Sequence, residues 1–183
     1  YSLGLTEAKL IPADQIVVDE RFRIHCAEPR CPNYDTSINC PPHSIMPDEF
    51  RKHLSSFRWV LAFKFDMPAE VMQGPEHREA SVLLHQATAA IEHQAKASGF
   101  DRACGYSGGG CKKSLCFEHP DCAALQEGGQ CRHPDEARPS LSGMGVNWYV
   151  LSQRLGWLMH TTEDGVANHR APTIMIAGLV LLE

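Results

Sequence analysis

Three features are scarce in this sequence, and each absence excludes a class of protein. The longest apolar run, 174–182, falls far short of the ~20 residues that cross a membrane. Acidic residues outnumber basic ones by 22 to 17, so the net charge is −5 and no cationic surface for nucleic acid is indicated. Residues 1–10 have neither the basic nor the apolar segment of a secretory signal. We therefore expect a cytoplasmic protein that binds neither a membrane nor nucleic acid.

Cysteine, in contrast, is abundant, with 8 residues in a chain of 183. In a small secreted protein this number would indicate disulfides, but a chain of this length can bury its own core and shows no export signal. Reduced thiolates that bind metal are therefore favoured. The hydrophobic content of 43% and the charged content of 21% are ordinary for a globular protein, and we expect one domain across 1–183.

Helical and strand patterns alternate along the chain. Apolar residues recur on one helical face across 76–98, and Gly99 fits the C-terminal cap of that helix. Further helices are expected at 47–57 and 146–157, and strands at 59–65, 100–106 and 173–182. Segment 11–24 fits a short helix or a strand, and 161–172 fits a surface turn. The alternation predicts an α/β fold in a single compact two-layer domain, with irregular cysteine-rich loops at 26–46 and 104–140.

The second of these loops holds a dense group of cysteines directly after glycines 108–110. Its members are Cys111, Cys116, Cys122 and Cys131. A [4Fe–4S] cluster takes up to four thiolates from a chain that wraps around it, and glycine lets the backbone approach and direct N–H groups at sulfur. The group predicts a metal site, although its spacing differs from the common bacterial ferredoxin run.

The first loop holds three cysteines: Cys26, Cys31 and Cys40. Pro41 and Pro42 follow, and ferredoxin runs also place proline after a ligand cysteine. Three thiolates leave one iron of a cluster without a protein ligand. The candidates for a fourth ligand are Cys104, His25 and His43. Alternatively the iron stays open and binds a substrate as a Lewis acid.

The two groups share a spacing, because each begins with a gap of four residues and contains a gap of eight before a nearby proline. Two similar metal loops, and thus two [4Fe–4S] clusters, are the simplest interpretation. The pairing stays open, since Cys131 could complete the first site while Cys104 completes the second. A single cluster with the other cysteines in structural roles is the alternative.

Structural zinc is the main competing interpretation of the cysteines. Zinc sites use cysteine pairs separated by two to four residues, and the gaps between the cysteines of this chain are mostly longer, so iron–sulfur is favoured.

Four histidines fall on predicted helices and are expected to face solvent: His53, His77, His85 and His93. The histidines of the second loop, His119 and His133, either hydrogen-bond near the ligands or lie on the surface. Four cations either offset cluster charge or are solvated: Lys112, Lys113, Arg132 and Arg138.

Several stretches of the chain together resemble a family of bacterial and archaeal predicted metal-binding proteins, domain-of-unknown-function family 2284. They are Val18–Arg21, Cys26 through Cys31 to Pro42, Gly108–Cys111, Cys122, Cys131–Pro134, Ala137–Ser140 and Gly145–Asn147. The resemblance covers nearly the whole chain. The sequence departs from many relatives at 141–143, where it reads Leu-Ser-Gly after the serine. The resemblance implies a metal and, through the cysteines, an iron–sulfur cluster, but no reaction.

Three functions are consistent with this pattern. An electron-transfer protein or redox accessory would have complete cysteine ligation and a redox partner protein. An enzyme would have an open iron at Cys26, Cys31 and Cys40, beside a pocket for a small molecule. A zinc-stabilised interaction module would have no redox role. Whether the chain forms a homo-oligomer is left open.

Overall fold

The centre of the molecule is a four-stranded antiparallel sheet with strand order β1-β2-β4-β3. The computed structural model describes residues 3–27, 30–157 and 172–183. The strands are β1 (Glu7–Pro12), β2 (Trp59–Pro68), β3 (Cys104–Ser107) and β4 (Thr173–Leu182). The helices are α1 (Glu20–Ala27), α2 (Pro47–Leu54), α3 (Ala69–Gln73), α4 (His77–Ala97) and α5 (Trp148–Arg154). Short 3-10 helices lie at Ala13–Gln15, Ala123–Leu125 and Ser142–Met144. The predicted α/β fold is confirmed.

The last strand of the chain, β4, lies inside the sheet between β2 and β3. Successive side chains of a strand point to opposite faces, and both faces of β4 are buried. Leu179 and Leu181 belong to the apolar core on one face, and Val180 and Leu182 to the core on the other. A strand buried on both faces is a continuous apolar run, which is why 174–182 stood out in the sequence.

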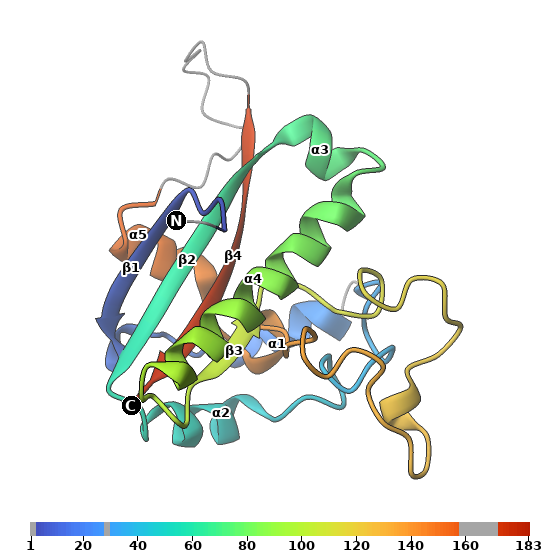
Figure 1. Cartoon of the computed structure of the whole chain (residues 1–183), viewed down its shortest axis with the longest axis horizontal. Coiled ribbons are helices and arrows are strands. Elements are labelled where there is room, and N and C mark those ends of the chain that lie inside the picture. The colour runs from blue at the N-terminus through green and yellow to red at the C-terminus, as the bar shows by residue number, and fades with distance from the viewer. Residues whose placement is uncertain (1–2, 28–29, 158–171) are drawn as a thin grey trace.

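Helix α4 covers one face of the sheet, as Figure 1 shows. Its Leu84 and Ala87 pack with Phe63 in the core of that face. The helix approaches closely because β4 has a glycine beneath it: a Cβ on Gly178 would come within 2.9 Å of the Thr88 hydroxyl. This close fit keeps α4 in one position, and α4 in turn carries residues that reach the cysteine loops.

The other face is covered by α2, α5 and the segment between the second cysteine loop and α5. Phe50 of α2 meets Tyr106 of β3 edge to face, with 5.2 Å between the ring centroids. Met144 and Leu151 are completely buried in the same core. Helix α2 begins with the side chain of Glu49 accepting the backbone N–H of Met46, at 2.9 Å. Such a reciprocal bond at a helix start satisfies a backbone donor that the helix itself cannot satisfy.

Several element boundaries differ from those expected. Segment 11–24 divides into the end of β1, a 3-10 turn and the start of α1, so Cys26 lies within a helix instead of a loop. Strand β3 and helix α5 are shorter than predicted, and α3 was not predicted. The predicted turn at 161–172 lies outside the described residues except for its last member. None of the described helices is long and apolar enough to span a membrane.

Candidate metal centre

The two cysteine groups, far apart in the sequence, meet beyond the end of β3. The side-chain amide of Asn39, next to Cys40, donates to the sulfur of Cys111 at 3.5 Å. A Cβ added to Gly110 would lie only 2.9 Å from the sulfur of Cys40. The thiol of Cys40 therefore packs directly against the glycine run that leads into the second group. Figure 1 shows both loops on the same side of the sheet, where the edge strand β3 lies.

The shared four-residue gaps form the same local turn in both groups. The backbone N–H of Cys31 donates to the carbonyl of Cys26 at 2.9 Å, and the N–H of Cys116 donates to the carbonyl of Cys111 at 3.4 Å. Each bond closes the chain between the first two cysteines of its group. The repeated spacing in the sequence thus corresponds to a repeated backbone turn, which holds two thiols on one short stretch of chain.

The chain surrounds these sulfurs with an environment that disfavours bare thiolates. Burial raises the pKa of Cys40 to about 12. Burial also raises the pKa of Cys111, although the polar groups of Asn39 and Ser37 act in the opposite direction. All eight cysteines are free thiols that form no disulfide. Thiols whose pKa burial raises in this way fit a bound metal, whose own charge would stabilise the thiolates.

The donor set and the backbone both fit a sulfur-ligated metal group. Thiolates are soft ligands suited to iron–sulfur clusters and zinc, and the glycine at 110 keeps the space beside Cys40 free of a side chain. Within the described ranges, no three Cys, His, Asp or Glu side chains converge closely enough to hold a single metal ion.

His85 is buried, although its position on a predicted helix led us to expect solvent exposure; that prediction is wrong. Only 1% of the residue is exposed, and burial lowers its pKa to about 4. The ring is therefore neutral, with one donor and one acceptor nitrogen. Its Nδ1 accepts the backbone N–H of Arg138 at 3.3 Å, and its other polar contact is the backbone of Gly110. His85 thus joins α4 to both ends of the second cysteine loop.

The spacing of His85 could have revealed this role. It follows Leu84 directly and precedes Thr88 by three residues, and both of these neighbours are buried. Of the other helical histidines, His77 and His93 are exposed as predicted, whereas His53 is half-buried against Phe57. In the second loop, the residue His119 is exposed and His133 lies 3.7 Å from the carboxylate of Glu136.

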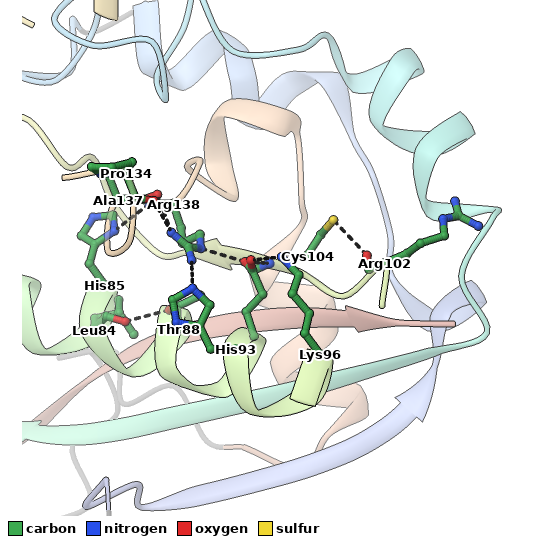
Figure 2. A network of polar contacts seen from close by, with 12 residues as sticks. Leu84, His85, Thr88, His93, Lys96, Arg102, Cys104, Pro134, Ala137 and Arg138 are labelled. Atoms are coloured by element: carbon green, nitrogen blue, oxygen red, sulfur yellow. Dashed lines mark hydrogen bonds and ion pairs between the residues drawn. The ribbon is translucent and has the colours of Figure 1, made fainter. Parts of the chain in front are cut away.

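Arg138 forms a buried ion pair instead of compensating cluster charge from the surface. Its Nε donates to the Glu92 carboxylate at 2.7 Å, and the two side chains are only 8% and 10% exposed. Its Nη1 donates to the carbonyls of Ala137 at 3.0 Å and Pro134 at 3.3 Å. The same carboxylate accepts the N–H of Gly105 at 2.7 Å. This network, drawn in Figure 2, fixes the end of the second loop to α4 and to β3.

Two further cations of the second loop hold its backbone. Lys112 donates to the carbonyls of Cys116 at 3.1 Å and His119 at 2.6 Å. Arg132 binds Asp121, with 3.0 Å between the guanidinium and the carboxylate, and its charge partly offsets the rise in the pKa of Cys116 that burial causes. Both residues therefore shape the wrapping of the loop.

Cys104 lies apart from both groups. Its thiol donates to the carbonyl of Arg102 at 3.2 Å, as Figure 2 shows, at the start of β3. The other end of that strand, Ser107, is the one that joins the cysteine loops, because its N–H donates to Pro139 at 3.0 Å. Three strand residues span about 10 Å. The structure does not bring Cys104 to the other cysteines, and its role as a ligand stays a prediction.

The two histidine candidates for a fourth ligand have other neighbours. The Nε2 of His43 lies 2.8 Å from the carboxylate of Asp35. The ring of His25, in α1, meets Phe22 edge to face with 6.1 Å between the centroids. In the described residues, His25 and His43 therefore have partners other than the three thiols of the first group.

We expect Gly110→Ala to reduce metal content. The added Cβ would lie 2.8 Å from Asn33 and 2.9 Å from the sulfur of Cys40, so one of these must move. Overpacking of this kind costs about 1–3 kcal/mol, and displacement of Cys40 would weaken a metal site. Gly99→Ala is the control, because Gly99 has a φ of +96 but nothing within 4 Å of its Cβ. Equal metal content in the two variants, measured by elemental analysis, would contradict the expectation.

Comparison with known protein families gives a match over almost the whole chain. A family model described as a predicted metal-binding protein (DUF2284) matches residues 9–182. The matched range begins within β1, ends at the last residue of β4, and contains both cysteine groups, the glycine run and Arg138. No curated protein and no solved structure matches the chain significantly.

Proposed function

Because the chain belongs to the family of predicted metal-binding proteins (DUF2284), we propose that its cysteine groups bind two [4Fe–4S] clusters and that it acts in electron transfer or as a redox accessory. One observation carries the proposal: the sulfur of Cys40 lies against Gly110, next to Cys111 of the other group. This contact brings one cysteine of the first group beside the start of the second, as a shared site would require.

Seven of the cysteines would hold the clusters in this proposal. The first group supplies Cys26, Cys31 and Cys40, and the second supplies Cys111, Cys116, Cys122 and Cys131. Cys104 is left out because its thiol lies at the far end of β3. Seven cysteines in two groups exceed the four ligands of a single zinc ion, which supports clusters over one zinc site.

The chain's own residues would hold and tune these groups. When bound, such clusters supply one-electron redox chemistry. Burial of Cys40 and Cys111 excludes water from their sulfurs. The backbone N–H of Asn33 donates to the sulfur of Cys31 at 3.5 Å, as the Asn39 amide does to Cys111. Hydrogen bonds to sulfur and exclusion of solvent are among the features that set the reduction potential of iron–sulfur sites. A redox partner protein belongs to this proposal.

A second candidate function is favoured by a hollow beside the first group. The hollow measures about 420 Å³, and Ala27, Pro41 and Pro42, the neighbours of Cys26 and Cys40, contribute to its lining. Small-molecule sites have comparable volumes. With three thiols and no fourth, an iron at this group could keep an open position for a small molecule, which would make the protein an enzyme.

Metal analysis of anaerobically purified protein tests the proposal. We expect brown protein with a broad absorption band at ~400 nm and with iron about equal to acid-labile sulfide. Added cyanide separates the two functions: an electron carrier with complete ligation should show unchanged EPR spectra, whereas an open iron should change the spectrum of one cluster. Stoichiometric zinc without sulfide would refute both functions and favour the zinc-stabilised module.

A further inference from the structure

A second hollow, larger than the one beside the first group, borders both cysteine groups. It measures about 540 Å³ and lies between the first turns of α4 and the glycine run. Asn33, two residues after Cys31, forms part of one wall, and Lys113, two residues after Cys111, forms part of another. We refer to it as the α4 cleft. Its volume is in the range of small-molecule sites.

Two residues that line the α4 cleft each have a buried polar atom without a partner in the described part of the chain. These atoms are the hydroxyl oxygen of Ser107 and the side-chain carbonyl oxygen of Asn33, and neither has a hydrogen-bond partner among the described residues. Ser107 is 0% exposed. A buried polar group left unpaired destabilises a fold, so native proteins rarely keep one without a use. These atoms therefore indicate that the cleft receives a molecule with a hydrogen-bonding group.

The rim of the α4 cleft is cationic. Arg78 and Lys113 line it, and among the described residues no Asp or Glu does. The nearest ion pair joins Arg78 to Glu79 at 3.1 Å, but the two side chains are 45% and 61% exposed, and such surface pairs are weak. The Glu76 carboxylate lies near Gly74 at the edge of the cleft. An incoming anion would therefore meet Lys113 and Arg78, and the weak surface pair of Arg78 with Glu79 opposes its approach little.

Apolar side chains complete the lining. Met72, Leu84 and Ile176 contribute to the walls. Phe117 also lines the cleft and is 64% exposed, with the guanidinium of Arg78 5.4 Å from its ring centre. Large exposed aromatic rings beside a cation are common features of ligand sites. The lining thus combines a cationic rim, an apolar middle and buried polar atoms.

We infer that the α4 cleft binds a small organic anion that has an apolar middle and a hydroxyl or amino group at its other end. Arg78 and Lys113 hold the negative group, and Ser107 and Asn33 pair with the hydroxyl or amino group. The oxygen of Asn33 accepts hydrogen bonds only, so the ligand must bring a donor. The inference depends on the lining of the cleft and holds for any metal at the cysteines.

Three probes of equal chain length separate these contributions: 6-hydroxyhexanoate, hexanoate and hexane-1,6-diol. Ligand-detected NMR on the metal-loaded protein gives their dissociation constants. We expect 6-hydroxyhexanoate to bind most tightly. Arg78→Gln should weaken both carboxylates about tenfold and leave the diol unchanged, since a charge-assisted hydrogen bond is lost. Lys52→Gln removes an exposed cation on α2 and is the matched control, which should change nothing.

Ser107→Ala tests the buried end of the cleft. It should weaken 6-hydroxyhexanoate about tenfold without affecting hexanoate, because only the first has a hydroxyl to pair. The same change removes an unpaired buried hydroxyl, so the thermal midpoint of the free protein should rise. The inference is overturned if no probe binds, if the diol binds as tightly as 6-hydroxyhexanoate, or if Arg78→Gln behaves like Lys52→Gln. The ~400 nm band of the same samples reports separately on the cluster proposal.

Discussion

Cys40→Ser should remove about half of the iron from the protein, whereas Cys104→Ser should leave iron and sulfide unchanged, if each cysteine group holds one cluster. Cys40 is 3% exposed and lies against the glycine run, so its thiol faces the place where the two groups meet. Serine is a much poorer ligand for iron than a thiolate, and its hydroxyl would be buried without a metal.

The Cys104→Ser variant is the matched control because it makes the same chemical change at a half-buried thiol of the same chain. The thiol of Cys104 donates to Arg102 and belongs to the edge of the core beside β3. The two variants are compared by iron and sulfide assays and by absorption at ~400 nm. Equal loss of iron from both variants would make Cys104 a ligand and would require a rearranged β3.

Glu92→Gln should lower the free energy of unfolding by about 3 kcal/mol, because the removal of one partner leaves a buried charge unpaired. The charge left behind is that of Arg138, whose side chain is only 8% exposed. The glutamine can still accept the N–H of Gly105, so the loss of charge is the main change. The measurement is guanidinium unfolding of the metal-loaded protein under anaerobic conditions, followed by circular dichroism.

Glu79→Gln provides the control for this effect. Glu79 is on the same helix and also pairs with an arginine, but its side chain is 61% exposed. Exposed pairs contribute about 0–1 kcal/mol, so this variant should unfold almost like the wild type. Equal losses of stability in the two variants would show that the buried pair has no special role. A Glu92→Gln variant that also loses iron would extend the role of the network to the cysteine loop that Arg138 fixes.

The contribution of Glu92 should also depend on pH. Burial raises the pKa of this carboxyl, but the hydrogen bonds from Lys96 and Gly105 and the charge of Arg138 outweigh it, so the pKa is lowered from its ordinary value of 4.5. A lowered pKa in the folded state gives stability that is present above the ordinary value and is lost as the pH falls through the folded value. The stability difference between the wild type and Glu92→Gln should therefore be largest above pH 4.5 and shrink in acid.

The sequence alone determined the features that depend on local patterns. The period of apolar residues predicted α4 closely, because a helix that packs on a sheet needs one apolar face. The apolar run 174–182 predicted the strand 173–182, which is β4 with its observed limits, because a strand buried on both faces is almost entirely apolar. The spacing of the cysteines grouped them and indicated two similar loops, and in the structure both four-residue gaps close through the same backbone bond.

Only the tertiary structure decided which of these groups meet. The last strand enters the middle of the sheet, and this order places Ser107 at the cysteine loops and Cys104 at the opposite end of β3. His85 and Arg138 bind each other across 53 positions of sequence, and Asn39 reaches Cys111 across 72. Local preferences contain no information about such contacts, because they arise when whole elements pack against one another and each polar group that is buried must find its partner.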